Sequence, residues 1–271
     1  MTETSRYLRF TRNSFARMLS YRSSVLFYVL GSLTQTLVLY YLWKAVFEGG
    51  TEGRPVINGF SFPEMVAYLV MTVAAQALVF GNADDVIADE IMDGSIAMNL
   101  ARPIDYRKRI FFDNLGVIAY NLAVTGLPAA AIALAVLSAA GIAPGLPALA
   151  LTLLSLGMAF FMNFYYRFCI GLMAILTTNM WGFTRLEAVV ASFLSGALIP
   201  LSFFPLWART IAQYLPFASL VYAPAMVFLG KLRGLELLRV LAVQALWLLA
   251  FRALSSFAWS RLVKRLAVNG G

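Results

Sequence analysis

Residues 62–81 have the sequence FPEMVAYLVMTVAAQALVFG, an apolar run with one charged residue, Glu64, near its start. A helix of about 20 apolar residues crosses the hydrocarbon core of a bilayer, which is about 30 Å thick. Ser61 and Glu64 form a capping-box pattern, and Pro63 suits the first turn of a helix. The run therefore predicts a membrane-spanning helix that begins at Phe62.

The rest of the chain has the same apolar character. Its 271 residues are 61% hydrophobic and 13% charged, whereas a soluble domain carries about 25% charged residues. We therefore predict an all-α integral membrane protein that forms a single transmembrane domain over residues 1–271. The six runs long enough to be spans are Ser24–Phe47, Phe62–Gly81, Leu115–Ala140, Leu146–Thr177, Leu186–Leu206 and Leu237–Trp259.

The distribution of basic residues predicts the orientation. An even number of spans places both termini on one side, and the segments on that side hold thirteen of the 21 Lys and Arg residues. The opposite side holds Lys44, Arg54, Arg209, Lys231 and Arg233. Because cytoplasmic loops carry the excess of Lys and Arg, both termini are predicted to be cytoplasmic. Topology and anionic lipid then account for the net charge, and nucleic acid is not expected as a partner.

Residues 1–22 are predicted to form an amphipathic helix. Tyr7 and Phe15 belong to its apolar side on a helical wheel. Four basic residues occupy the opposite side: Arg6, Arg9, Arg12 and Arg17. Such a helix lies along the lipid headgroups, so the segment is expected to be interfacial.

The residue types exclude several kinds of chemistry. The chain has no histidine and one cysteine, Cys169, so neither a His/Cys metal site nor a catalytic Ser/His or Cys/His pair is expected. No carboxylate lies well inside a run, which disfavours an internal proton relay but leaves open a sodium site built from backbone carbonyls. The P-loop pattern is also missing. We therefore predict no catalytic residue, metal or cofactor in this chain, and expect another polypeptide to supply the energy for uphill transport.

A polar segment, residues 84–110, separates the second and third runs. The sequence from Asp84 to Met92 predicts a helix that continues the second span. Gly94 suits a C′ position, where a positive φ has little cost. Ser95 is predicted to cap a second short helix, Ile96–Leu100. The segment would then be bent between two short helices.

The second short helix is expected to present an apolar tip that includes Ile96 and Met98. Pro103 biases Arg102 towards an extended conformation and ends this helix. The basic residues 107–109 are expected to lie against lipid headgroups and anchor the third span. We interpret the segment as a rigid cytoplasmic lever; the alternative is a solvated loop that only connects two spans.

Residues 206–230 contain Pro216 and Pro224, which interrupt any helix there. The segment is predicted to be re-entrant at the outer face and to act as a lid. An ordinary belt of interfacial aromatic residues, including Trp207 and Tyr214, is the alternative.

Two polar residues, Asn163 and Arg167, lie inside the fourth run. An arginine at mid-membrane costs about 2.5–3.5 kcal/mol on insertion scales. Arg167 is therefore expected to snorkel to the cytoplasmic headgroups, or else to line a translocation path. Asn163 is expected either to hold helices together or to line the same path. Pro128 is expected to kink the third run.

Two segments resemble permeases of the type-2 ABC transporter (ABC-2) family, and in particular a bacterial export subgroup. The first is DEIMDGSIAMNLARPID, in which Arg102 and Pro103 form a pair typical of that subgroup. The second comprises LSGALIPLSFFPLW and YLPFASLVYAP. The matching positions are Glu90, Gly94, Ser95, Leu100 and Pro103 in the first segment and Ser195, Gly196, Pro200, Pro205, Pro216, Phe217 and Pro224 in the second.

The resemblance implies a permease subunit in the bacterial plasma (inner) membrane that forms a homo- or heterodimer with a second permease. Two separate ATP-binding subunits would hold ATP and magnesium and push on the lever through Glu90, Gly94, Ser95, Leu100, Arg102 and Pro103. The N-terminal helix would flank their docking site, although a simple lipid anchor stays open. Short outer loops favour export. The alternatives are a self-contained secondary transporter or channel, and an intramembrane enzyme or assembly factor.

Overall fold

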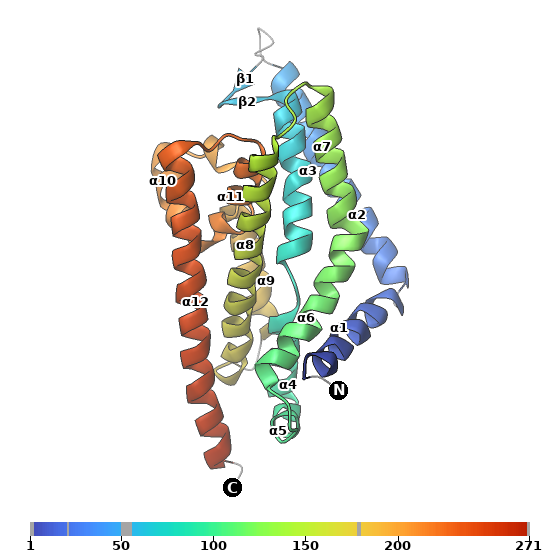
Figure 1. Ribbon diagram of the computed structural model, residues 1–271, viewed down its shortest axis with the longest axis vertical. Helices are drawn as coiled ribbons and strands as arrows, with labels where there is room; N and C mark the ends of the chain where they lie inside the picture. The colour runs from blue at the N-terminus through green and yellow to red at the C-terminus, as the bar shows by residue number, and fades with distance from the viewer. Residues whose placement is uncertain (1–2, 21, 50–55, 178–179, 270–271) are drawn as a thin grey trace.

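The computed structural model describes residues 3–20, 22–49, 56–177 and 180–269, so Arg54 of the predicted outer loop lies outside the described residues. Most helices run along the long axis of the molecule (Figure 1). A two-stranded antiparallel hairpin, β1 (Val56–Ile57) and β2 (Phe60–Ser61), lies at one end. Both termini and helix α5 (Ser95–Leu100) lie at the other end, as an even number of crossings requires.

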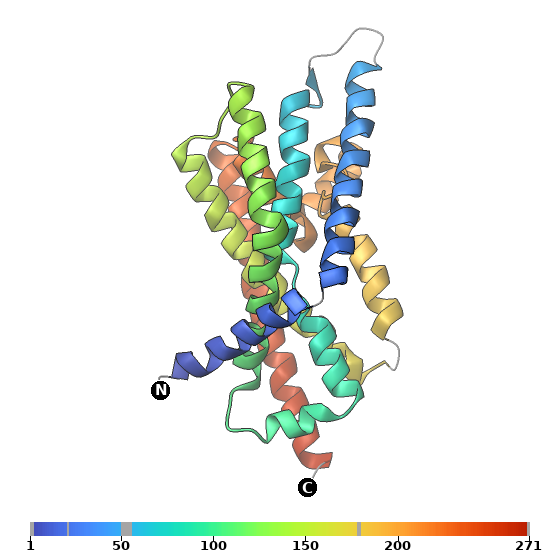
Figure 2. The ribbon, with the colours of Figure 1, turned by 90° about the vertical axis from the view of Figure 1, so that its right-hand side faces the viewer.

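The N-terminal part contains the helix predicted to be interfacial, two long helices and the bent polar segment. Helix α1 lies across the long axis of the bundle, and its N-terminus points away from it (Figure 2). This crosswise placement suits a helix along a membrane surface. The helices are α1 (Glu3–Ser20), α2 (Arg22–Glu48), α3 (Phe62–Val79), α4 (Ala83–Met92) and α5.

The C-terminal part contains three long helical stretches and the outer segment. Helix α12 packs along α8, α7 packs against α3, and α6 packs against α1. The elements are α6 (Tyr106–Asn121), η1 (Leu122–Gly126), α7 (Leu127–Ala139), α8 (Leu146–Leu172), η2 (Met173–Ile175), α9 (Met180–Leu194), η3 (Leu201–Phe203), α10 (Leu206–Tyr214), η4 (Pro216–Ser219), α11 (Tyr222–Phe228) and α12 (Gly234–Asn269).

Within the described residues, four helical stretches are long and apolar enough to cross a membrane. A fifth is gained if α10 and the bent segment after it, which meet at 71°, count as one span. Helix α2 covers the first predicted span without interruption but is not among the four, so the count of six stays a prediction. The four stretches are Phe62–Met92, Tyr106–Ala139, Leu146–Ile175 and Gly234–Val263.

The capping box predicted at the start of the second span is confirmed. The Ser61 N–H donates a hydrogen bond of 2.7 Å to Glu64 Oε2, and Pro63 lies in the first turn of α3. Lys231 adds a bond of 2.6 Å to Glu64 Oε1 and one of 2.7 Å to the Gly59 carbonyl. The first turn of α3 is thereby joined to the hairpin and to the loop before α12.

The predicted limits of the fifth span, Leu186–Leu206, are wrong. Helix α9 begins earlier, at Met180, and ends at Leu194. Gly196 follows with a φ of +77°, and Pro200 and Pro205 lack the N–H that a longer helix needs. The buried backbone of this turn finds a partner in the protein, since Tyr68 Oη donates to the Gly196 carbonyl at 2.6 Å. Non-helical backbone at membrane depth requires such protein partners.

Pro128 is accommodated by a wide turn. The π-helical segment η1 directly precedes α7, and its wider turn makes room for the ring and the missing N–H of Pro128. The third span is longer than predicted, because helical structure is continuous from Tyr106 to Ala139.

Buried apolar side chains form separate clusters towards the two ends of the molecule. The largest surrounds α3 and includes Met65 and Val79. A second surrounds α4 and includes Ala83, Ile87 and Phe168. The boundary between these two clusters coincides with the break between α3 and α4.

Candidate functional site

The polar segment after α4 has the bent conformation that its sequence predicts. Gly94 adopts the left-handed conformation with a φ of +78° and stands between α4 and α5. The predicted cap is wrong: Ser95 is the first residue of α5, and its N–H donates a 2.8 Å hydrogen bond to Asp93 Oδ1. An aspartate side chain commonly accepts a hydrogen bond from the backbone N–H two residues further on, and Asp93 does so across the turn at Gly94.

Hydrogen bonds from Ser95 lower the pKa of the exposed Asp93 carboxyl. A carboxyl whose pKa is lowered on folding stabilises the fold above its unfolded pKa, and this contribution is lost as the pH falls through the folded pKa. The turn between α4 and α5 therefore holds its acceptor ionised at neutral pH.

The predicted apolar tip is only partly exposed. Met98 has 60% of its surface exposed, and Met92 at the end of α4 is also exposed. Ile96 was expected at the tip but is buried with Ile87 and Ile110 in the cluster around α4, and Leu100 packs partly against that cluster. Burial of Ile96 fixes α5 against α4 and α6, so the bend between the two helices is packed.

The two ends of the polar segment are joined by an ion pair. Arg109 Nη2 lies 2.6 Å from both carboxylate oxygens of Glu90, and both side chains are largely buried. Tyr106 Oη donates a further hydrogen bond of 2.8 Å to Glu90, and the guanidinium of Arg109 stacks over the Tyr106 ring. The carboxylate of α4 is thus held by two side chains of α6.

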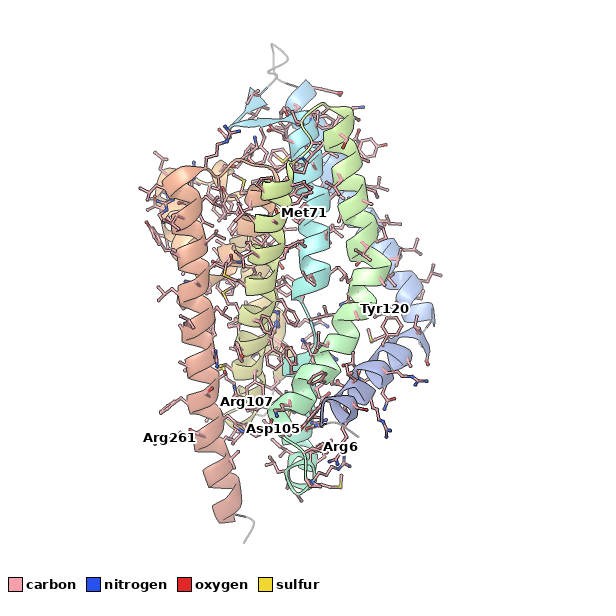
Figure 3. All side chains as sticks on the ribbon, in the orientation of Figure 1. Arg6, Met71, Asp105, Arg107, Tyr120 and Arg261 are labelled. Carbon is pink, nitrogen blue, oxygen red and sulfur yellow. The ribbon has the colours of Figure 1, made fainter. Side chains whose placement is uncertain are left out.

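The expectation that residues 107–109 all face lipid headgroups is therefore wrong. Arg109 is buried in the Glu90 pair, and Arg107 reaches α12, where its Nη1 donates to Ser256 Oγ at 3.1 Å. Lys108 remains exposed. Figure 3 shows Arg107 and Asp105 at the end of the bundle that also holds α5. The start of α6 is consequently fixed to α4 and to α12.

The connecting residues between α5 and α6 are exposed. Helix α5 ends at Leu100, as predicted, and both Arg102 and Pro103 lie on the surface. Asp105 caps α6 by accepting a 2.9 Å hydrogen bond from the Lys108 N–H. The Asp105 N–H in turn donates to Tyr7 Oη of α1 at 2.9 Å. The polar segment therefore touches the N-terminal helix directly.

Helix α1 is attached to α6 along its length. Thr11 Oγ1 donates to the Phe112 carbonyl at 2.7 Å, and Ser14 bonds to Asp113. A side chain at Gly116 would lie 2.3 Å from the Thr11 carbonyl oxygen, so only glycine permits this approach. Of the predicted basic face, Arg17 reaches Asp113 at 3.4 Å, and the four basic side chains, Arg6, Arg9, Arg12 and Arg17, are exposed.

Arg167 does not snorkel towards water. Its Nη1 lies 2.7 Å from Asp84 Oδ2 and 3.1 Å from Glu187 Oε2. The side chains of the three residues are 12%, 3% and 8% exposed, respectively. Tyr166 Oη donates a further 2.8 Å hydrogen bond to Glu187. The cluster joins α8 to α4 and α9.

Sequence reasoning missed both acidic partners of Arg167. Both residues lie near the ends of predicted runs. They are far from Arg167 along the chain, so the sequence does not indicate that they contact it. An unpaired arginine inside a run is the available signal, because an intramembrane charge is expected to have a partner. Gly171, one turn further along α8, permits the contact, since a Cβ there would lie 2.9 Å from the Asp84 carbonyl oxygen.

The predicted re-entrant region consists of short helices, α10, η4 and α11, with the 71° bend between α10 and the elements that follow. Pro205 and Pro216 each stand at the start of one of these helices. The Phe217 ring lies 6.0 Å from that of Tyr166. Pro200, Pro216 and Pro224 are buried, whereas Pro205 is exposed. The bend agrees with a re-entrant segment, and the role of a lid stays a prediction.

The comparison with protein families gives one match. A family described as "ABC-2 family transporter protein" matches residues 30–270, which is most of the chain. No curated protein matches the sequence. The matched range includes α3 to α12 and hence both ion-pair clusters. The chain therefore belongs to the ABC-2 family of transporter proteins, and it is a multi-pass membrane component of that family.

Proposed function

We propose that this chain is the permease subunit of an ATP-driven exporter in a bacterial plasma membrane. It would pair with a second permease subunit, and two separate ATP-binding subunits would bind ATP and magnesium and supply the energy. Family membership supports this proposal, as does the sequence, in which the P-loop pattern is missing.

The observation that carries the proposal is the attachment of α4. Near its end α4 is held to α6 through Glu90 and Arg109. Near its start Asp84 binds Arg167 of α8, which also binds Glu187 of α9. The exposed face of α5 lies beyond these contacts. A force applied to α5 would therefore be passed to three helices at once. This is the property expected of a coupling segment, in which Gly94, Ser95, Leu100, Arg102 and Pro103 shape the surface.

Reconstitution tests the proposal. The purified chain in vesicles is expected to show no uphill transport alone, and ATP-driven transport when an ATP-binding subunit that co-purifies with it is present. Mass measurement of the complex is expected to give two permeases and two ATP-binding subunits. Uphill transport by the chain alone with an ion gradient would instead support a self-contained secondary transporter.

The bend at Gly94 gives a further prediction. Replacing Gly94 with glutamate forces an L residue into a left-handed conformation, which costs about 1–2 kcal/mol, and places a charge beside α5. Transport is expected to be lost, while membrane insertion and yield stay close to wild type. Gly141→Glu is a matched control, because Gly141 also has a positive φ, +72°, but lies at the opposite end of the bundle. Wild-type transport in Gly94→Glu would contradict the coupling role.

A further inference from the structure

The break between α3 and α4 lies at the predicted end of the second span. Helix α3 has 18 residues, and at 1.5 Å per residue it is about 27 Å long. This length is close to the thickness of the hydrocarbon core, about 30 Å, so residues 80–82 lie near its inner edge. The end of α3 leaves carbonyls without helical partners, and the start of α4 leaves N–H groups. Such groups need protein partners at this depth.

Three asparagines from two other helices supply those partners. Asn163 of α8 donates its Nδ2 to the Val79 carbonyl at 2.8 Å, and Asn121 of α6 donates to the Phe80 carbonyl at 3.4 Å. Asn114 of α6 accepts the Asn82 N–H at 3.1 Å. Asn163 and Asn114 are only 1% and 3% exposed. The break is thus held on both sides by asparagine side chains, two of which are buried.

Gly81 makes the bracing possible. A Cβ at Gly81 would lie 1.8 Å from Asn114 Oδ1. The absence of a side chain lets the amide approach the backbone of the break. Among the described residues, Asn163 Oδ1 and Asn82 Oδ1 are buried without a hydrogen-bond partner. Each of these two oxygens can still accept a hydrogen bond, so the backbone and side chains at the break could bond in a second arrangement.

The break also lies between two apolar clusters, and helix α8 runs through both of them. Val79 belongs to the cluster around α3, and Ala83 belongs to the cluster around α4 that contains Ile96 of α5. Residues 80–82 are the short connection between them, which Figures 1 and 2 both show. A change in the angle between α3 and α4 would concentrate in this short connection.

We propose that residues 80–82 form a hinge and that Asn114, Asn121 and Asn163 are positioning residues that transmit movement of α4 and α5 to α3. This inference rests on the proposed function. Ion pairs hold α4 to α6 and α8, and with the brace intact these two helices also hold the end of α3, so that it moves with them. Without the brace, α4 turns about the break and α3 stays in place.

Transport per ATP hydrolysed by the full complex in vesicles is the functional test. Asn163→Leu, Asn114→Leu and Gly81→Ala are each expected to keep ATP hydrolysis close to wild type. Their transport per ATP is expected to fall roughly tenfold, the scale of a typical coupling between sites. Gln244→Leu is the matched control: Gln244 is buried and donates to the Ser155 and Ser219 carbonyls, both at 2.8 Å, far from the break. It is expected to lower thermal stability and leave transport per ATP unchanged.

Hydrogen exchange of the purified full chain in lipid discs tests the brace separately. The asparagine variants are expected to lose protection at residues 80–86 only. Unchanged protection there, unchanged transport per ATP, or an equal loss of coupling in Gln244→Leu would each overturn the hinge. If the wild-type complex shows no ATP-driven transport, the proposed function fails, and the exchange result still decides whether the amides hold the break.

Discussion

Arg167→Met is expected to lower the free energy of unfolding by about 3–5 kcal/mol, because one substitution leaves two buried carboxylates without their cation. Asp84 and Glu187 both lie within 3.1 Å of the guanidinium and are almost fully buried. The effect is measured by heating the purified chain in detergent and recording how much of the monodisperse species is lost at each temperature. A fall in membrane yield is expected together with it.

Two further variants make this prediction specific. Arg252→Met removes an exposed arginine of α12 for which no ion pair occurs within the described residues, and it is expected to unfold like wild type. The triple variant Arg167→Met, Asp84→Asn, Glu187→Gln removes all three charges and is expected to recover most of the lost stability, since neutral replacements of buried ion pairs are often tolerated. Wild-type stability in Arg167→Met, or no recovery in the triple variant, would refute the cluster.

Arg109→Met is expected to abolish most ATP-driven transport. The change leaves Glu90 buried with only the Tyr106 hydroxyl as partner, and loss of one partner of a buried pair costs about 3 kcal/mol or more. The α4–α5 unit would separate from α6, so movement of α5 would no longer reach the third span. Transport and ATP hydrolysis by the complex in vesicles are the measurements.

The exchanged pair Glu90→Arg with Arg109→Glu is expected to restore part of the transport. Asp89→Asn is the control, because Asp89 is the adjacent acid on α4 but its side chain is exposed. It is expected to transport like wild type. If Arg109→Met retains full transport, or if Asp89→Asn loses as much, the pair does not connect the coupling segment to the third span.

Local features of the fold could be predicted because they depend on neighbouring residues. The start of α3 follows from Ser61, Pro63 and Glu64, and the bend after α4 follows from Gly94, which are all short-range signals. The end of the fifth helix was missed because residues 195–205 are apolar throughout most of their length, and hydropathy does not distinguish a buried turn from a span. The turn at Gly196 is also held by a hydrogen bond from Tyr68, which lies 128 positions earlier in the chain.

The contacts of the candidate site depend on distant parts of the chain and could not be predicted. Asp84 and Arg167 are 83 positions apart, and only the packing of α4 on α8 brings them together. Sequence reasoning selected Glu90 and Gly94 as coupling residues, which stays a prediction, and it gave Glu90 no partner. It placed Ile96 on the surface because a six-residue helix shows too little periodicity to separate a buried side from an exposed one.

The close contact at Gly116 has a consequence for the surroundings of the protein. Helix α1 is packed against α6, and Tyr7 binds Asp105, the residue that caps α6. A surface helix that is not packed against the rest of a protein can change its depth in the membrane independently. Helix α1 is packed against α6, so a change in its depth would also move α6. The thickness and surface charge of the bilayer should therefore set the resting tilt of α6, and the same chain should respond differently in thin and thick membranes.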